Sequence, residues 1–136
     1  MQTIRTRDHS KDKSFSLEKW VGTLGGAALS TDSDPNTSEP VTNRVIRARA
    51  KRDGVMVMGT MLLRVVIADG TSLTFRPWMY DNHESKWIPH GNAQTVTFAT
   101  GNIGNGTVLP GNIAGAKVFV QITANTGCTV MGIDFS

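Results

Sequence analysis

The sequence predicts an all-β fold, a jelly roll or another two-sheet β-sandwich, for most of the chain. Runs rich in Val, Ile, Thr, Phe, Tyr and Trp recur at short intervals, and clusters of Gly, Asn, Asp and Pro separate them. Within most runs apolar and polar residues alternate, which is the period of a strand with one buried face. Seven to nine such runs can be counted, and no long stretch has the period of an amphipathic helix. Many short strands between turn signals are typical of a sandwich or a barrel.

Length and composition limit the possible classes of protein. A chain of 136 residues has room for one domain with one hydrophobic core. Hydrophobic residues make up 39% of it, and no apolar run approaches the ~20 residues that span a bilayer. The first residues lack the apolar stretch of a secretory signal, so we expect a soluble protein that folds where it is made. The net charge of +3 is too small to indicate nucleic acid as a partner.

The centre of the predicted fold is a meander of three strands. Asp69-Gly70 lies between two β-rich runs, residues 63–68 and 72–80, and an Asp-Gly pair is the strongest short-range signal of a hairpin. A polar loop then leads into a short third strand, residues 86–89. Two of the three tryptophans and the only tyrosine lie in this meander, so we expect it to form the nucleus of the core.

The second strand of the meander carries large apolar residues on both faces. Phe75 and Met79 share one parity of the strand, whereas Trp78 and Tyr80 share the other. Pro77 lies between the two halves and predicts an edge position or a bulge, because proline cannot donate to the ladder. A strand that buries different faces along its length fits the corner of a two-sheet sandwich.

Residues 1–22 are predicted to form an extended N-terminal arm, and residues 23–136 the jelly-roll domain. The arm has mixed charge and too little apolar surface to fold by itself. Three large apolar residues near its end, Phe15, Leu17 and Trp20, need a partner to bury against. The arm docks either on its own sandwich or on a neighbouring subunit, and a disordered tail is the remaining alternative.

Residues 43–52 contain the densest group of positive charges. Arg47, Arg49 and Lys51 alternate with smaller apolar residues, which predicts a strand with one basic face, although Arg and Ala also favour a helix. The Asp53-Gly54 turn and the β-rich run after it favour the strand. This run lacks the aromatic residues that stack on bases, so its basic face is either solvated or meets an acidic protein surface.

The second half of the chain adds three more predicted strands. Residues 94–100 alternate in hydropathy and precede a Gly- and Asn-rich loop. Residues 116–123 and 128–135 flank Ala-Asn-Thr-Gly and predict a final hairpin. The expected core draws on these strands and on the central meander, and its predicted members are Leu73, Phe75, Val96, Phe98, Val118, Val120 and Ile122.

The sequence offers little that resembles a catalytic or metal site. Asp81, His83, Glu84 and His90 are the one cluster of ligand types, but they lie on a polar turn without a His-x-His pair. Cys128 is the single cysteine, which excludes an internal disulfide, and we expect it to be a small buried residue on a late strand. We therefore expect no enzyme activity, no metal and no cofactor.

The stretch Leu-Thr-Phe-Arg-Pro-Trp-Met-Tyr-Asp, the later Lys-Trp-Ile-Pro and the terminal Lys-Val-Phe-Val-Gln-Ile-Thr run resemble small jelly-roll cement proteins of tailed bacteriophages. The resemblance covers about residues 23–136. It implies a virion structural protein, a decoration protein that binds the outside of a phage capsid, stabilises joints between capsomers and pairs as a homodimer. The implied partner is the major capsid protein, with neither nucleic acid nor a membrane involved. The expected location is the capsid exterior, after synthesis in the host cytoplasm.

The residues expected to contact the capsid or a second subunit belong to the arm and to the basic strand. They are Phe15, Leu17, Trp20, Arg47, Arg49 and Lys51.

Two other functions stay open, because a jelly roll does not fix a function. A tail-fibre, baseplate or glycan-binding module would use exposed Trp78, Tyr80 or Trp87 to stack on sugar rings, so burial of the tryptophans would argue against it. A cupin-like enzyme would use His83 and His90, and it would hold a tightly bound, stoichiometric metal.

Overall fold

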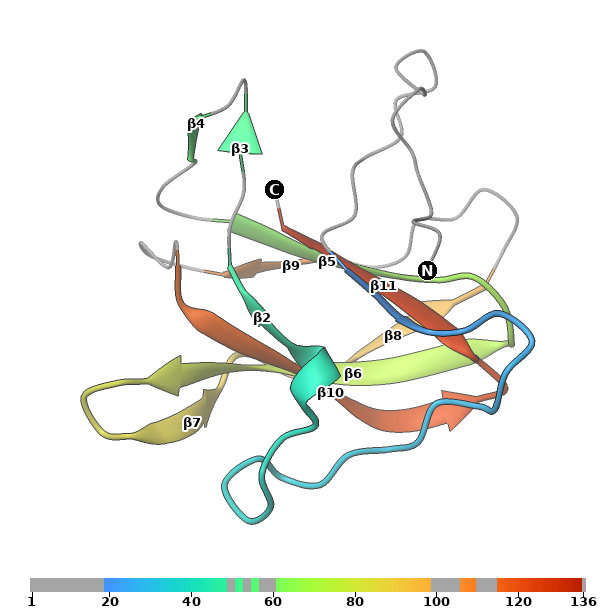
Figure 1. Cartoon of the computed structure of the whole chain (residues 1–136), viewed down its shortest axis with the longest axis horizontal. Coiled ribbons are helices and arrows are strands. Elements are labelled where there is room, and N and C mark those ends of the chain that lie inside the picture. The colour runs from blue at the N-terminus through green and yellow to red at the C-terminus, as the bar shows by residue number, and fades with distance from the viewer. Residues whose placement is uncertain are drawn as a thin grey trace.

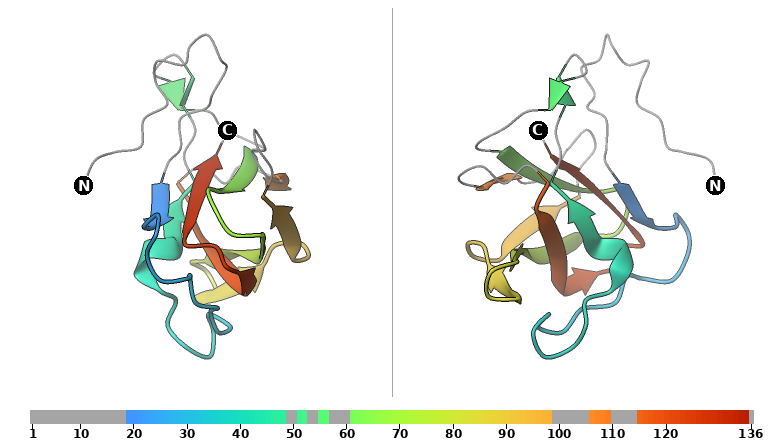
Figure 2. Two further views of the ribbon diagram at one scale, coloured as in Figure 1. Left: turned by 90° about the vertical axis from the view of Figure 1, so that its right-hand side faces the viewer. Right: turned by 60° about the vertical axis from the view of Figure 1, so that its left-hand side comes forward.

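The computed structural model describes residues 19–48, 51–52, 55–56, 61–98, 106–109 and 115–135. Most of these residues form two antiparallel sheets that pack against each other as a sandwich (Figure 1, Figure 2). Sheet A has four strands in the order β1 (Lys19–Gly22), β11 (Val130–Phe135), β5 (Met61–Ile67) and β9 (Gly106–Leu109). Sheet B has five, in the order β2 (Val45–Arg47), β10 (Lys117–Thr126), β6 (Ser72–Asp81) and β7 (Lys86–Pro89), with β8 (Gln94–Thr97) also paired to β6. A separate ribbon joins β3 (Lys51–Arg52) and β4 (Val55–Met56).

The strand order is that of a jelly roll, in which the first half of the chain pairs with the second half in reverse order. β1 pairs with β11, β2 with β10, β5 with β9, and β6 with both β7 and β8. These successive pairs belong alternately to sheet A and sheet B. The topology is therefore one long antiparallel ribbon rolled around a core, and the predicted all-β jelly roll is confirmed.

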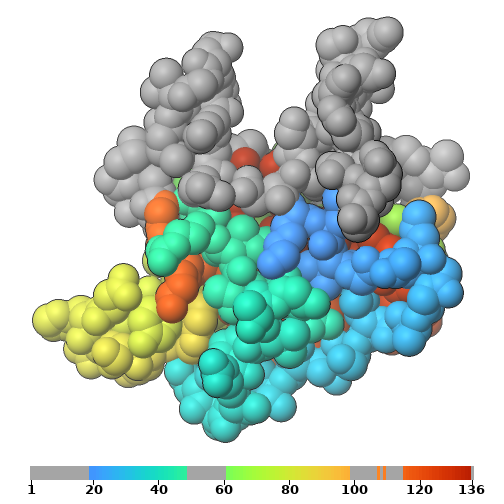
Figure 3. Space-filling view, in the orientation of Figure 1, coloured from blue at the N-terminus to red at the C-terminus, as the bar shows by residue number. Residues whose placement is uncertain are grey.

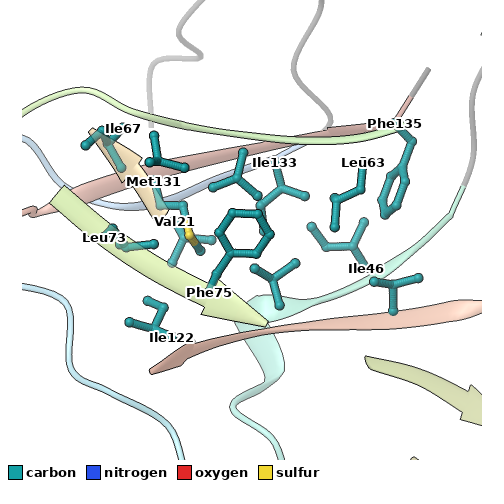
Figure 4. Packing of buried hydrophobic residues seen from close by; sticks show 14 of the residues in the cluster. Val21, Ile46, Leu63, Ile67, Leu73, Phe75, Ile122, Met131, Ile133 and Phe135 are labelled. Atoms are coloured by element: carbon teal, nitrogen blue, oxygen red, sulfur yellow. The ribbon is translucent and has the colours of Figure 1, made fainter. Parts of the chain in front are cut away.

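The core lies between the two sheets and is almost entirely aliphatic. Phe75 points from β6 towards Ile133 of sheet A and is fully buried (Figure 4). Six of the seven predicted core residues are buried, and the prediction for Phe98 is wrong, because its side chain is 43% exposed. β8 ends at Thr97, so Phe98 has already left the strand whose parity would have turned it inwards. The prediction also omitted the sheet A half of the core, which consists of Val21, Met61, Leu63, Val65, Ile67, Leu109, Met131, Ile133 and Phe135.

Neither of the two predicted hairpins at Asp69-Gly70 and at residues 124–127 pairs the strands that flank it. β5 belongs to sheet A and β6 to sheet B, and the same separation holds for β10 and β11. Each turn is therefore a corner at which the chain passes from one sheet to the other. A turn signal specifies a reversal of the chain, but the burial of inward-facing side chains decides which strand becomes the neighbour.

The two corners lie against each other and are joined by hydrogen bonds. The Asp69 carboxylate accepts from the N–H of Thr129 at 2.7 Å and also from its hydroxyl. These two donors hold the pKa of Asp69 below its usual value. Gly70 has φ +78°, and a Cβ there would lie 2.5 Å from the backbone nitrogen of Cys128. Only glycine therefore fits at this close approach of two backbones.

β6 is an inner strand of sheet B, so the edge position predicted from Pro77 is wrong. β7 and β8 pair with successive stretches of the same side of β6, and Pro77 lies in the interval between them. Its carbonyl still accepts from the N–H of His90 at 2.8 Å, so the missing proline N–H costs one ladder bond at most. The irregularity in this sheet occurs on β10, between Ile122 and Ala124.

The sandwich begins within the range that was predicted for the arm. β1 pairs with β11 over its whole length, and Val21 is 2% exposed in the main core. Trp20, predicted as an arm residue, lies in this strand opposite Gly132, on the outer face of sheet A. One inward apolar side chain between Trp20 and Gly22 is too weak a pattern to reveal a strand in the sequence. Phe15 and Leu17 lie outside the described residues.

The predicted basic strand is shorter than residues 43–52. Thr42–Arg44 form a 3₁₀ turn and β2 covers only Val45–Arg47. Ile46 is buried and Arg47 is exposed, as the predicted alternation requires. Arg49 lies outside the described residues, and only the backbone of Lys51, in β3, is described. Across the described part of the chain, no helix has the length and apolar character needed to cross a bilayer.

Candidate functional site

The outer face of sheet B carries a second apolar cluster. Trp78, Trp87 and Phe119 are buried on this face, and Val45 and Tyr80 pack at its margin. The rings of Tyr80 and Trp87 meet edge to face with centroids 5.1 Å apart, and those of Trp87 and Phe119 lie 6.0 Å apart. The outer face of an antiparallel sheet normally meets water, so an aromatic cluster of this size needs a cover.

The cover is residues 30–44, which we call the strap. In Figure 1 most of the strap runs below β10, and its 3₁₀ turn lies in front of the sheet. Asp32 pairs with β10 beyond the end of β2. Its N–H donates to the Ile122 carbonyl and its carboxylate accepts from the Ile122 N–H, both at 2.8 Å. Gln121 then connects the strap to the cluster, because it donates to the Asp32 carbonyl at 3.2 Å and accepts from the Trp78 indole at 2.8 Å.

A buried ion pair holds the end of the strap. Arg44 and Asp32 are joined by an N–O distance of 3.2 Å, and their side chains are 5% and 2% exposed. Arg44 also donates to the Ser30 carbonyl at 3.2 Å. Burial raises the pKa of Asp32, and this effect is larger than the opposite effects of the Ile122 N–H and of Arg44. Because desolvation dominates, the pair fixes the position of the strap more than it stabilises the fold.

Asn36 fastens the strap to the edge of β7. Its side-chain oxygen accepts from the Trp87 N–H at 2.9 Å, and its side-chain nitrogen donates to the Trp87 carbonyl at 2.8 Å. The N–H of Asn36 donates to the Asp34 carboxylate at 2.7 Å, which fixes the turn, and the adjacent Pro35 is buried. The side chain of Asn36 therefore takes the place that a neighbouring strand would take beside β7.

Two cations face each other at the margin of the cluster, and one of them, Lys117, lines an open groove. Arg47 on β2 is directly opposite Lys117 on β10. The Lys117 ammonium lies 4.5 Å from the centre of the Tyr80 ring, and Arg47 donates to the Gly115 carbonyl at 2.6 Å. The groove has a volume of about 330 Å³, and it is lined by Glu39, Pro40, Thr42, Val45, Tyr80, Trp87 and Lys117.

This arrangement suits contact with a protein surface better than stacking on a sugar. Trp78 and Trp87 are only 5% and 8% exposed, so too little of either ring is accessible for a sugar to stack on it. Tyr80 is half-buried, and Lys117 lies over its ring. The groove has a mixed lining, in which Glu39 and Lys117 lie beside Pro40, Val45 and aromatic residues. With Arg47 exposed next to it, this margin fits a partner that offers both acidic and apolar groups.

Of the six residues predicted as contacts, Arg47 reaches this face. Trp20 lies on the outer face of the other sheet, so the structure does not bring it together with Arg47. The predicted ligand cluster is also spread out: His83 is exposed in the β6–β7 turn, whereas His90 follows β7. Among the described residues, no group of three or more His, Cys, Asp or Glu side chains could hold a metal ion. Cys128 is buried, as predicted, but it lies in the corner before β11.

Several residues that form this face were not predicted as site residues from the sequence. Lys117 precedes the apolar run of β10 and could have been found from the alternation of that strand. The roles of Asp32, Asn36 and Arg44 could not have been found in this way. The composition of a polar loop or a basic run does not indicate which distant strands its residues will contact.

Comparison of the chain with protein-family models, with curated proteins and with solved structures found no match.

Proposed function

We propose that this protein is a virion structural protein, a cement protein that decorates the outside of a phage capsid and stabilises the joints between capsomers. Its partner would be the major capsid protein, and a pair of copies would act together at each joint. The protein would be made in the host cytoplasm, would need no cofactor and would catalyse no reaction. The resemblance in the central strands and the jelly-roll fold, which viral capsid proteins often use, both support this proposal.

The observation that carries the proposal is the cation pair at the groove. Arg47 and Lys117 face each other across the β2–β10 ladder, and like charges directly opposite destabilise a sheet. Each makes a contact within the chain, yet Arg47 remains exposed and Lys117 lines the groove. An acidic capsid surface would relieve their repulsion and would give the two cations a role. Arg49 and Lys51 continue the same basic run in the sequence. Phe15, Leu17 and Trp20 would add apolar contacts, those of Trp20 from the outer face of sheet A.

Charge reversal tests this proposal. The double variant Arg47→Glu and Lys117→Glu should weaken attachment to the native capsid roughly tenfold or more, mainly by slowing association. The loss should be larger at low salt than at high salt, because screening weakens the charge contacts of the wild type. Cosedimentation with capsids across a salt series measures both effects.

Lys19→Glu is the matched control, because Lys19 is a cation on β1 of sheet A, away from both the groove and β7. It should leave attachment unchanged. Equal binding of the wild type and the double variant at every salt concentration would remove this face from the interface. A second set of variants, with Arg49 and Lys51 reversed, extends the test to the rest of the basic run.

A tail-fibre, baseplate or glycan-binding module is the alternative proposal. Burial of both tryptophans counts against sugar stacking on this face. Binding of the wild type to a glycan array, with loss of that binding in Tyr80→Ala, would favour the alternative.

A further inference from the structure

β7 is the outermost strand on one side of sheet B. The backbone N–H and carbonyl groups of its successive residues point alternately towards β6 and towards the open edge. The N–H of His90 donates to Pro77, which makes that pair a hydrogen-bonded one. Counting back along the register, Met79 and Ile88 are also such a pair, whereas Tyr80 and Trp87 are not. The N–H and carbonyl of Trp87 therefore point away from β6, towards the open edge.

The Trp87 backbone is the one position on this edge that offers both a donor and an acceptor. Pro89, the next residue that points outwards, has a carbonyl but no N–H. Asn36 occupies the Trp87 position with a side-chain amide, which has the same donor and acceptor groups as a peptide unit. The strap thus closes an edge that would otherwise accept another strand.

We infer that β7 is the edge through which two copies of this protein pair, and that Asn36 is a plug that a second β7 strand displaces. The inference rests on the proposed function only in that a cement protein is expected to act as a pair. The occupant is a second copy because the edge is complementary to itself. A two-fold axis at Trp87 lets the two Trp87 backbones exchange both hydrogen bonds, and an antiparallel pair is what such an axis requires.

The side chains next to the axis also fit this register. Lys86 of each copy would lie opposite Ile88 of the other, so no like charges face each other. Ile88 is 40% exposed and lies beside a groove of about 310 Å³ on the same hairpin, and pairing would cover part of it. The groove is lined by Met79, Tyr80, Asp81, Asn82, Ile88, Pro89 and His90. The hairpin projects from the body of the molecule, where a second copy can reach it (Figure 3).

The plug makes pairing conditional. Asn36 belongs to the same chain as Trp87, so it competes at a high effective concentration, and the free protein should be largely monomeric. Binding to a capsid that holds two copies close together would favour exchange of Asn36 for the second strand. The two states cannot coexist at one edge, because both use the same Trp87 backbone groups.

The test is the oligomeric state of Asn36→Ala. This variant should dimerise roughly ten- to a hundredfold more tightly than the wild type, because two competing hydrogen bonds are removed. Thr37→Ala is the matched control: it lies in the same turn, its hydroxyl donates to the Asp34 carbonyl at 2.9 Å, and it should behave as the wild type. Sedimentation over a concentration series measures the dissociation constants, and near-UV circular dichroism reports whether the aromatic cluster stays packed. A folded Asn36→Ala that remains as monomeric as Thr37→Ala would overturn the inference.

Disulfide cross-linking tests the register and does not depend on the Asn36 variant being folded. In the proposed dimer residues 86 and 88 of different copies are a non-hydrogen-bonded pair with Cα atoms about 4.5 Å apart, within reach of a disulfide. A mixture of Lys86→Cys and Ile88→Cys chains at high concentration should therefore give a mixed cross-linked dimer under mild oxidation, and more of it with Asn36→Ala. Absence of the mixed dimer, or equal cross-linking of either variant with itself, would overturn the proposed pairing. Neither result bears on the charge-reversal test, so the two proposals can fail separately.

Discussion

Arg44 illustrates how a residue that looks like surface charge in the sequence becomes part of the interior. Its guanidinium pairs with Asp32 within the strap, beside β10, and both side chains are almost fully shielded from water. Replacing Arg44 with Met would leave a buried carboxylate without a counter-charge. We expect a loss of about 3–5 kcal/mol in the free energy of unfolding, measured by urea titration.

Two comparisons make the Arg44→Met measurement specific. Adding Asp32→Asn to that variant should recover part of the loss, because a neutral amide needs no counter-charge. Arg47→Met, three residues away and exposed, should change the free energy of unfolding by no more than about 0.5 kcal/mol. If Arg44→Met is as mild as Arg47→Met, the ion pair is not what holds the strap.

At the scale of the elements, the sequence predicts strands well and their partners poorly. Alternation identified β8, and β-rich composition between turn signals identified β6, β7, β10 and β11. β11 is buried at every position and β10 at five consecutive positions, so neither of them exposes a whole face. The same alternation says nothing about which sheet a strand joins. The Asp69-Gly70 pair therefore correctly predicted a turn, but this turn connects β5 of sheet A to β6 of sheet B and does not form a hairpin.

The corner at Gly70 can be tested against another glycine with the same backbone. Gly70 and Gly91 have φ +78° and +81°, so alanine strains both to a similar extent. A Cβ at Gly91 would meet nothing within 4 Å, whereas at Gly70 it would lie 2.6 Å from the carbonyl carbon of Gly127. We expect Gly91→Ala to cost about 1–2 kcal/mol of unfolding free energy and Gly70→Ala about 1–3 kcal/mol more, from the clash.

Thermal and urea unfolding of the two alanine variants measure this difference. Equal costs would mean that the corners can move apart, and that their close approach does not limit the fold.

At the scale of the whole molecule, the sequence located one side of the candidate site. The basic run led to Arg47, which is exposed on β2 as its alternation predicts, and the contact of Arg47 with a partner stays a prediction. The sequence analysis predicts that the aromatic residues of the meander belong to the core. Trp78 and Trp87 are indeed buried, but on the outer face of sheet B, in a cluster separate from the main core. That strap depends on contacts between residues far apart in the chain, such as Asn36 with Trp87, and no local pattern encodes them.

The position of β1 leads to a prediction for the whole chain, because it separates the arm from the sandwich at Lys19. Deleting residues 1–18 should leave unfolding close to that of the wild type, since every described strand of both sheets remains. Deleting residues 1–22 also removes β1, whose four residues pair with β11 and whose Val21 fills the core. Burial of one valine contributes on the order of 2 kcal/mol, and the lost ladder adds to this, so the longer deletion should melt at a clearly lower temperature.

The same two deletions distinguish attachment from folding. If the arm holds the protein on the capsid, deleting residues 1–18 should abolish cosedimentation with capsids while the melting temperature stays unchanged. Trp20→Ala in the full chain shows whether the indole on the outer face of sheet A contributes to attachment, to stability or to both. If deleting residues 1–18 lowers the melting temperature as much as deleting residues 1–22, Phe15 and Leu17 belong to the packing of their own sandwich, and attachment must be sought at Arg47 and Lys117 alone.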